Sequence, residues 1–317
     1  MKAYGNPESL ARAADQVLLE VSPEGVARIT LNRPEKHNAM TVPMRRRLMA
    51  LVHQCEADDR VRVVVFAGNG KSFCSGNEIN EDWGQRQPGT RRMSLSMANR
   101  YASDLNYGRQ AFSQAITRCS KPTVLRLHGY CAAAAYFMIG TRCDLVVVSP
   151  NSKIGALEAR FLGPAGAVSA THINRILGTK AARRYGYSGA VMTGEDALRV
   201  GLAHRCVPDE AMDAEVDRLA RRLAQRPPAM ANYMMKRVRA AESLFETNVR
   251  EVNGLLFSHF LQAAPDEAHF WTQVKTSGVA GALAADKARL AKATGDAIGA
   301  GPAPGQSETQ GRADTHD

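Results

Sequence analysis

Short apolar runs, each ended by turn-forming residues, recur along the first half of the chain. Val17–Val21 and Val26–Leu31 flank a turn that contains Pro23 and Gly25, a pattern that predicts a β-hairpin. The run Val63–Ala67 is apolar at every position, as is typical of a strand covered on both faces. Two more buried strands are predicted at 122–127 and 145–148.

Helical periodicity alternates with these strands. Apolar residues recur every three or four positions after Thr41, which we expect to cap a helix that has Pro43 in its first turn. A strand, a helix and a further strand in this order imply a right-handed crossover between parallel strands. The alternation predicts an α/β core that binds ligands at the carboxyl ends of its strands. Further helical segments are expected at 93–119, 171–187, 195–201, 209–226, 229–262 and 266–290.

Two segments rich in small residues follow predicted strands. Gly68–Gly70 ends the strand at 63–67, and the amides around Ser75 and Gly76 can face a ligand because no large side chain shields them. This arrangement is typical of half an oxyanion hole. The run Ala132–Ala135 favours a helix whose N-terminus can approach a ligand closely.

Composition narrows the class of protein. The chain has 317 residues and a net charge of +10, which favours either anionic partners or a solvated basic surface. Its six cysteines form no C-x-x-C pair and have no histidine at metal-ligand spacing, so no metal site is predicted. No apolar run approaches the roughly 20 residues of a membrane span, and residues 1–16 do not have the pattern of a targeting peptide. We therefore expect a cytoplasmic protein without membrane contact.

Five longer segments carry more specific information because they occur together and in order. They are LNRPEKHNAM (31–40), KSFCSGNEI (71–79), KPTVLRLHGYCAAAAY (121–136), RCDLVVVSPNSKIGALEARFLGPAGA (142–167) and SGAVMTGEDALRVGLAHRCVP (188–208). With these segments the chain resembles the crotonase superfamily, which contains the enoyl-CoA hydratases and isomerases. Five motifs in family order are far more specific than any one of them.

The resemblance implies an α/β fold of the crotonase-like (ClpP/crotonase) type, a spiral of ββα units with a C-terminal helical region. It divides the chain into an N-terminal extension (1–15), an α/β core (16–210), a helical trimerisation region (211–292) and a tail (293–317). The tail is rich in Gly, Pro, Ser and Thr and is expected to be disordered. Because the family forms trimers and dimers of trimers, a homotrimer or a dimer of trimers is expected here.

The resemblance also implies an oxyanion hole made of two backbone amides. It places one at Ser75 and the other in the alanine run. Counting from Gly129 puts the second amide at Ala134, whereas counting back from Asp144 puts it at Ala135, because this chain has one extra residue between those anchors. The two amides would polarise the thioester carbonyl of an acyl-CoA and so stabilise an enolate.

Acid and base chemistry departs from that of the best-known hydratases, which use two glutamates. Glu158 falls on the second of those positions and is the predicted acid/base residue. The first position corresponds to Phe137 or Met138, and neither side chain can transfer a proton. One carboxylate can still deprotonate an α-carbon, shuttle a proton or orient a water molecule.

The resemblance also implies which residues contact the substrate. Coenzyme A is expected only as part of the thioester substrate, and no permanently bound cofactor is expected. The coenzyme A moiety is expected to contact Lys36, Asn38, Ala39, Gly76 and Asn77, mostly through backbone groups. The acyl pocket is expected to be lined by Trp83, Tyr136, Phe137 and Met138.

The most specific hypothesis is hydration or double-bond isomerisation of a 2-enoyl-CoA through an oxyanion-stabilised enolate. The single glutamate also leaves hydroxycinnamoyl-CoA hydratase-lyase, acyl-CoA hydrolase and decarboxylase chemistry open. A non-catalytic CoA-binding homologue is a further alternative. RNA binding through Arg45–Arg47 is less favoured than a solvated helix face, because three adjacent arginines spread around a helix instead of forming a stripe.

Overall fold

The computed structural model describes residues 11, 13–78, 109–160, 170–229, 232–238 and 265–294. The chain forms two compact units, residues 1–270 and residues 271–317. None of the helices in the described part of the chain is long and apolar enough to cross a bilayer.

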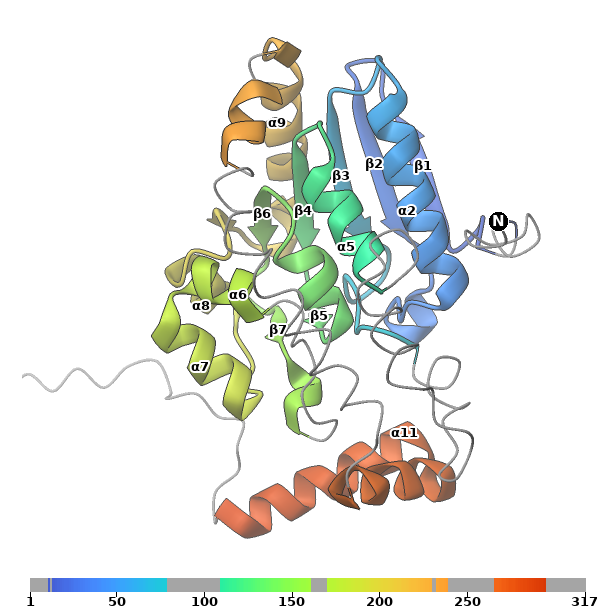
Figure 1. The fold of residues 1–317 in the computed structure, drawn as a ribbon, viewed down its shortest axis with the longest axis vertical. Coiled ribbons are helices and arrows are strands. Elements are labelled where there is room, and N and C mark those ends of the chain that lie inside the picture. Colours follow the sequence, from blue (N-terminus) through green and yellow to red (C-terminus); the bar gives the residue numbers. More distant parts are fainter. Residues whose placement is uncertain are drawn as a thin grey trace, which may run out of the picture. The chain divides into compact units, whose positions relative to one another are not determined.

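A six-stranded sheet forms the centre of the first unit (Figure 1). Its strands lie in the order β1-β2-β3-β4-β6-β8; β1 and β2 form the predicted antiparallel hairpin, and every other neighbouring pair is parallel. The strands are β1 (Val17–Val21), β2 (Val26–Leu31), β3 (Val63–Gly68), β4 (Thr123–Leu127), β6 (Leu145–Val148) and β8 (Arg205–Cys206). All six residues of β3 are buried, as its apolar sequence predicts.

Helices cover both faces of this sheet. On one face, α2 (Val42–Ala57) and α5 (Arg109–Arg118) pack with the β3 side chains of Val64 and Phe66 in the larger hydrophobic core. On the other face, α9 (Met212–Ala224) packs against Val63 and Val65. The alternation of strand side chains between two faces thus supplies two separate cores. Thr41 caps α2 as predicted, because its hydroxyl accepts a hydrogen bond from the Met44 N–H at 3.3 Å.

A second, smaller layer is built from the segments that follow the strands of the large sheet. β5 (Tyr130–Ala132) follows β4, β7 (Lys153–Gly155) follows β6, and the two pair in parallel. Isolated bridges extend this layer, and they join Met40 to Asn77, Cys74 to Cys131, and Ile154 to Met192. β2, β3, β4 and β6 are thus each followed by a short extended segment of the second layer, which is the repeating ββα unit of the crotonase-like fold.

The helices that follow are short. They are η3 (Leu157–Arg160), α6 (Ala170–Leu177), α7 (Thr179–Ser188), α8 (Gly194–Arg199) and η5 (Asp209–Ala211). The predicted helix at 171–187 is divided at Gly178, whose φ of 73° lies in the left-handed region. Thr193 and Asp196 form a capping box that starts α8.

The C-terminal helices differ in their relation to the core. α9 buries Met212, Val216, Ala220 and Ala224 against the sheet, so residues 212–224 belong to the layered core, although the resemblance groups them with the helical region. α11 (Pro265–Thr294) is interrupted at Gly278, which has φ 70° and ψ 175°. Most of the predicted helix at 229–262 and nearly all of the tail lie outside the described residues. The trimerisation role of residues 211–292 stays a prediction.

Candidate active site

The loop from β2 to α2 is held by a buried amide, that of Asn38. Its side chain is 0% exposed, and its Oδ1 accepts a hydrogen bond from the Arg33 N–H at 2.7 Å. Its Nδ2 donates to the carbonyl oxygens of Asn69 at 2.9 Å and Ser72 at 2.8 Å. Asn38 therefore ties this loop to the loop after β3. Because its side chain is fully engaged inside the protein, the predicted contact with coenzyme A at this position is restricted to the backbone.

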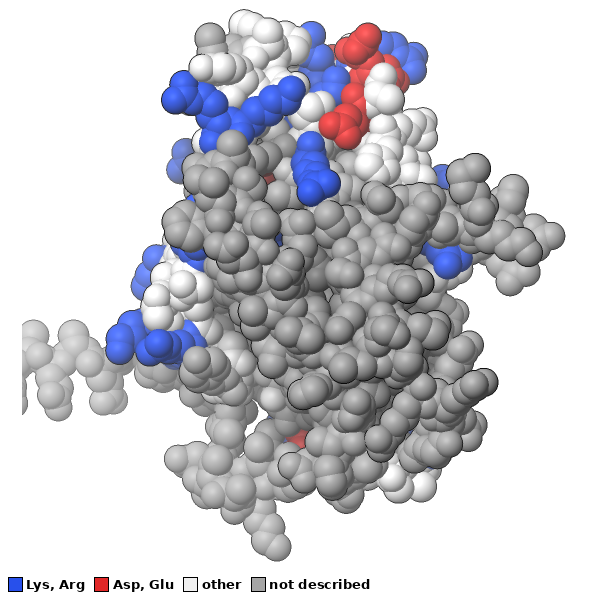
Figure 2. Space-filling model, viewed as in Figure 1, with Lys and Arg blue, Asp and Glu red and all other residues white. Residues whose placement is uncertain are grey.

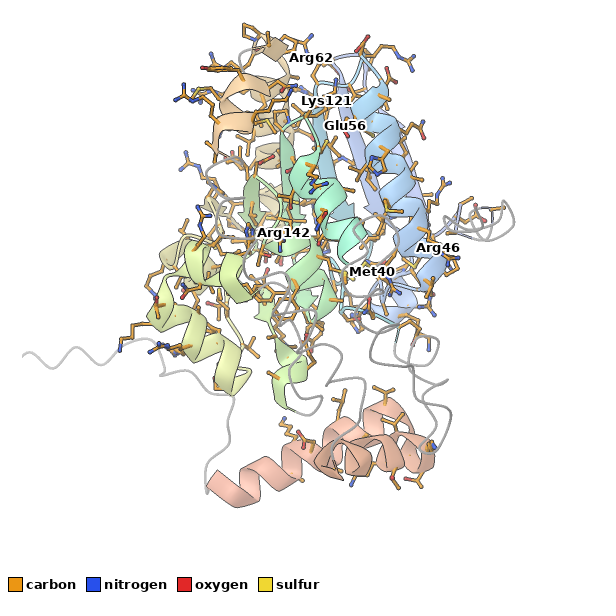
Figure 3. The ribbon with its side chains drawn as sticks, viewed as in Figure 1. Met40, Arg46, Glu56, Arg62, Lys121 and Arg142 are labelled. Carbon is orange, nitrogen blue, oxygen red and sulfur yellow. The ribbon has the colours of Figure 1, made fainter. Side chains whose placement is uncertain are left out.

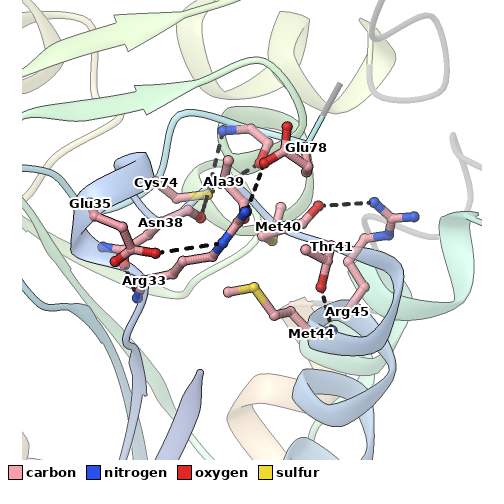
Figure 4. A network of polar contacts seen from close by, with 11 residues as sticks. Arg33, Glu35, Asn38, Ala39, Met40, Thr41, Met44, Arg45, Cys74 and Glu78 are labelled. Atoms are coloured by element: carbon pink, nitrogen blue, oxygen red, sulfur yellow. Dashed lines mark hydrogen bonds and ion pairs between the residues drawn. The ribbon is translucent and has the colours of Figure 1, made fainter. Parts of the chain in front are cut away.

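The segment Gly76–Glu78 is held against the same loop, and Figure 4 shows the contact of its Glu78 with Arg33. The Met40 N–H donates to the Gly76 oxygen at 2.7 Å, and the Glu78 N–H donates to the Met40 oxygen at 2.9 Å. Arg45 donates to the Asn77 Oδ1 at 2.7 Å, and Arg33 forms an ion pair with Glu78 at 2.8 Å. Two backbone hydrogen bonds and two side-chain contacts thus hold the loop that follows β3.

The Ser75 N–H, which the resemblance assigns to the oxyanion hole, is already engaged. It donates to the carbonyl oxygen of His37 at 2.9 Å and is therefore not free to receive a thioester oxygen. The Asn77 N–H, in contrast, makes no hydrogen bond to any residue that the structure describes. The free amide of this loop lies two residues further along than the sequence indicates.

Gly76 explains why the two amides differ. In regular extended backbone, residues three apart direct their N–H groups to opposite sides, yet the N–H groups of Ser75 and Glu78 both reach the 37–40 segment. Gly76 lies between them with a φ of 116°, which reverses the backbone. The Asn77 N–H, between these two, consequently makes no bond to the 37–40 segment. A Cβ at Gly76 would lie 2.9 Å from the Ala133 Cβ and 3.4 Å from the Ala134 nitrogen, so this loop closely approaches the alanine run.

The alanine run begins a helix, as predicted, directly after β5. Ala133 has a φ of 51° and donates its N–H to the Gly155 oxygen at 3.0 Å, and the helical conformation starts at Ala134. Amides in the first turn of a helix have no partner within the helix. The Ala134 N–H accordingly makes no hydrogen bond within the described part of the chain.

The same helix continues as a π-helix from Tyr136 to Gly140, in which the Thr141 N–H donates to the Tyr136 oxygen at 3.0 Å. A π-turn accommodates one more residue than an α-turn. The extra residue between Gly129 and Asp144 can therefore lie in the π-helix, after Ala135. An insertion there does not change the spacing between Gly129 and the alanine run, so the second predicted amide is that of Ala134.

Glu158 lies in the turn η3, three residues after the end of β7. Its side chain is 6% exposed, and its Oε2 has no hydrogen-bond partner among the described residues. Burial raises the pKa of Glu158 to about 8, because the ionised form loses its hydration. The Tyr136 hydroxyl is also buried and without a partner in the described structure. Burial raises the pKa of Tyr136, and the neighbouring charges of Cys131 and Glu158 add to this effect.

The other predicted residues contribute little polar chemistry. Phe137 is buried and Met138 is partly buried, whereas Lys36 is exposed on the turn η1 (Pro34–Lys36). Trp83 lies outside the described residues. Cys74, beside the loop, is fully buried and donates to the Asn38 oxygen at 3.0 Å. Burial raises its pKa to about 12, so it is no nucleophile at neutral pH. In the described part of the chain, no three His, Cys, Asp or Glu side chains are grouped so as to hold a metal ion.

The arginines of α2 do not form one surface. Arg45 reaches Asn77, and the Arg47 Nε donates to the Val17 oxygen at 2.7 Å, at the start of β1. Figure 3 labels Arg46 beside α2 at the edge of the molecule. Figure 2 shows Lys and Arg side chains over α7 and α9, and others near the opposite edge of the same view. Arg45 and Arg47 therefore stabilise the fold, and the consecutive arginines do not make the stripe that an RNA-binding helix needs.

The layered spiral of ββα units places the chain in the crotonase superfamily. The family model for enoyl-CoA hydratase/isomerase matches residues 22–269, so the chain belongs to the enoyl-CoA hydratase/isomerase family. This identification confirms the fold class that the sequence motifs predict, and with it an enzyme family that acts on CoA thioesters.

Known relatives of the chain differ in the reaction that their names state. It is 29% identical to the (E)-benzylidenesuccinyl-CoA hydratase of Thauera aromatica over 77% of this chain and 88% of that protein. It is 28% identical to the mitochondrial Delta(3,5)-Delta(2,4)-dienoyl-CoA isomerase of Dictyostelium discoideum over 64% of this chain and 69% of that protein. It is 25% identical to the hydroxycinnamoyl-CoA hydratase-lyase of Pseudomonas fluorescens over 68% and 76%, respectively.

Solved structures show the same architecture. The crystal structure of an enoyl-CoA hydratase from Mycobacterium smegmatis superposes with a TM-score of 0.76 at 26% identity, over 87% of this chain and 95% of that one. An enoyl-CoA hydratase/isomerase from Xanthobacter autotrophicus Py2 gives 0.75 at 26% identity, over 86% and 98%.

Proposed function

We propose that the protein activates an acyl-CoA thioester through two backbone amides, those of Asn77 and Ala134. Both N–H groups are without a partner in the described structure, and Gly76 brings their chain segments together. Two donors directed at one thioester oxygen stabilise the enolate that forms when the α-carbon loses a proton or the β-carbon is attacked. Each such donor typically contributes about 3 kcal/mol to the transition state.

Glu158 is the acid/base residue in this proposal, and its buried, unpartnered carboxyl oxygen is the observation that supports the proposal best. A carboxyl group with a pKa of about 8 is partly protonated near neutral pH. It can donate a proton in one step and accept one in the reverse direction, as a proton shuttle between two carbons or between carbon and water requires. The reaction that we propose is hydration or double-bond isomerisation of a 2-enoyl-CoA.

A hydroxycinnamoyl-CoA hydratase-lyase type of reaction is the second candidate. The observation that favours it is the apolar Phe137, which lies in the same helix as Ala134 and leaves Glu158 as the single predicted carboxylate. A relative with that activity in its name matches at 25% identity. In both cases we propose that coenzyme A lies along Lys36, the Ala39 backbone and Gly76, and that Tyr136, Phe137 and Met138 line the acyl pocket.

Turnover assays test this proposal. Wild type and Glu158→Gln are incubated with a panel of enoyl-, aromatic and β-keto-acyl-CoAs, and products are measured by mass spectrometry. Removing a general acid/base typically lowers the rate by about 10²–10⁴-fold. We expect this loss in Glu158→Gln with CoA-thioester binding nearly unchanged.

The matched control is Glu195→Gln, which makes the same change at an exposed position of α8. It should keep full activity. Wild-type turnover in Glu158→Gln would contradict the proposed role. No turnover of any thioester by wild type, together with thermal stabilisation by those thioesters, would favour a non-catalytic CoA-binding protein.

A further inference from the structure

Asn77 carries one of the two amides of the proposed oxyanion hole, and its backbone is held only through its neighbours in the described part of the chain. Neither its N–H nor its carbonyl oxygen makes a hydrogen bond to a residue that the structure describes. The Met40–Asn77 bridge is formed by the residues on either side of Asn77. The Gly76 oxygen accepts the Met40 N–H, and the Glu78 N–H donates to the Met40 oxygen. A direct hold on Asn77 therefore has to come through its side chain.

The Asn77 side chain has a single partner among the described residues, and this partner is Arg45. The Arg45 Nη1 donates to the Asn77 Oδ1 at 2.7 Å, a short distance for an N–H···O hydrogen bond. Because a guanidinium only donates, the carboxamide has to present its oxygen to Arg45, which fixes the orientation of the side chain. A hydrogen bond from a charged donor is also stronger than one between neutral groups. Asn77 is thus anchored by one strong and directional contact.

The same guanidinium nitrogen reaches both members of the bridge. The Arg45 Nη1 lies 3.5 Å from the Met40 oxygen, a weaker contact that Figure 4 shows. This nitrogen carries two hydrogens, so it can donate to Met40 and to Asn77 at once. Met40 is 0% exposed and belongs to the larger hydrophobic core. Arg45 therefore connects Asn77 to a rigid part of the protein.

Arg45 has a fixed position because it belongs to the first turn of α2. Its N–H donates to the Thr41 oxygen at 3.1 Å, and the Thr41 side chain caps the helix. The partial positive charge at a helix N-terminus opposes a cation in this turn, and the first turn of α2 contains no acidic residue. The charge of Arg45 therefore does not stabilise α2. Its contact with the loop after β3 gives it a different role.

Arg33 holds the next residue of that loop in a similar way. Its Nη1 donates to the Glu78 Oε2 at 2.8 Å and to the Ala39 oxygen at 3.1 Å. Two arginines from the two ends of the segment before α2 thus bind the side chains of Asn77 and Glu78. The Glu78 N–H is bonded as well, whereas Asn77 has no described contact besides the one with Arg45. Loss of Arg45 should therefore affect Asn77 most.

We propose that Arg45 is a positioning residue for the oxyanion hole and acts through the Asn77 side chain. The proposal rests on the proposed function, because it takes the Asn77 N–H as a donor to the thioester oxygen. Such a donor stabilises the transition state when its direction is fixed beforehand, and a displacement of about 1 Å can lower the rate by about 10²-fold. Gly76, directly before Asn77, restricts the backbone less than any other residue would. The Arg45 hydrogen bond supplies the restraint that Gly76 does not.

The test is a double-mutant cycle of Arg45→Met and Asn77→Ala, with kcat and KM measured on the thioester that wild type turns over fastest. Both variants keep the backbone N–H of residue 77. Each should lower kcat by at least about tenfold and leave KM within about threefold, because a fixed donor acts mainly in the transition state. The double variant should be no slower than the single variants, since both changes break the same hydrogen bond.

Two further variants of α2 complete the cycle. Arg46→Met makes the same change at the next position, where the side chain has no ion pair or hydrogen bond with the described residues, and it should keep the wild-type kcat. Arg45→Lys keeps the charge and a donor and should recover part of the loss. Wild-type kcat in Arg45→Met, an equal loss in Arg46→Met, or losses that multiply in the double variant would overturn the proposal. Multiplied losses would show that Arg45 does not act through Asn77.

Hydrogen–deuterium exchange separates this proposal from the proposed function. The Met40 and Glu78 amides join the two segments, and mass spectrometry of the peptides that contain them measures their exchange. Exchange should be about tenfold faster in Arg45→Met and Asn77→Ala than in wild type and Arg46→Met, because the loop opens locally more often. If wild type turns over no thioester, the proposed function fails, and the exchange rates still show whether Arg45 holds this loop. Wild-type exchange in both variants would overturn the positioning role whatever the activity.

Discussion

Asn38 and Glu158 are two buried polar side chains in loops that follow strands, and their environments are opposite. Asn38 is completely buried, and its amide makes three hydrogen bonds to backbone groups. Glu158 is almost as buried, yet one of its carboxyl oxygens has no partner among the described residues. Burial alone therefore does not distinguish a structural polar group from a functional one, whereas hydrogen-bond satisfaction does.

Ionisation of Glu158 is expected to lower the free energy of unfolding, whereas Asn38 does not ionise. Its pKa in the folded protein is about 8, above the ordinary value of 4.5, so between these pH values the folded state binds more protons than the unfolded state. The free energy of unfolding should then fall as pH rises through this window. Glu158→Gln removes the titration, and its stability relative to wild type should increase by up to about 5 kcal/mol between pH 4 and pH 9.

Chemical denaturation of both proteins at several pH values measures this difference, in which all shared titrations cancel. Glu195→Gln should show no such trend, because Glu195 is exposed. A wild-type and Glu158→Gln difference that stays constant with pH would show that Glu158 is not buried in a charge-excluding site.

For Asn38 the opposite result is expected. Asn38→Ala leaves the Arg33 N–H and the carbonyl oxygens of Asn69 and Ser72 without their partner. Each of these three unsatisfied buried groups costs at least about 1 kcal/mol, so the free energy of unfolding should fall by at least about 3 kcal/mol at every pH. Urea denaturation measures the loss. An unchanged midpoint would refute the role of Asn38 as the tie between the two loops.

The elements around these two residues differ in how well the sequence predicts them. Apolar runs and a Thr cap predict the hairpin, β3, β4, β6 and α2, because these elements depend on local periodicity. The order of the motifs identifies the family, and the alanine run indicates a helix start. The position of Glu158 follows from its motif, but its burial depends on packing that no local pattern specifies.

Other features depend on single backbone angles or on contacts between distant residues. β5 and β7 have three residues each, too few for a periodicity signal. The choice of Asn77 over Ser75 follows from the reversal at Gly76, and only the hydrogen bonds reveal it. The contact that joins β4 to α9 depends on Arg126 meeting Asp213, 87 residues away.

Gly76 offers a smaller and more selective change to the proposed site. Gly76→Ala introduces a Cβ at 2.9 Å from the Ala133 Cβ and requires alanine to adopt a φ of 116°. We expect a stability loss of about 1–3 kcal/mol from the backbone strain. Turnover should fall by about 10²-fold or more, because displacement of the Asn77 amide removes one oxyanion donor.

Gly178→Ala is the control for the strain term, since Gly178 also has a positive φ, but a Cβ added there would have no described atom within 4 Å. It should lose stability without a comparable loss of kcat. Equal kcat values for Gly76→Ala and wild type would contradict the placement of the Asn77 amide in the oxyanion hole.

Tyr136→Phe is expected to have the smallest effect on stability and tests whether Glu158 acts alone. The Tyr136 hydroxyl has no partner in the described structure, so its removal leaves no group unsatisfied, and the free energy of unfolding should change by less than about 1 kcal/mol. If the hydroxyl only lines the pocket, kcat should stay within about threefold of wild type, and the pKa of Glu158 should remain the controlling value in the pH–rate profile. A fall of about 10²-fold in kcat with unchanged stability would instead assign proton transfer to Tyr136. Because both groups are buried and unpartnered, this single hydroxyl decides whether the site has one titratable catalytic group or two.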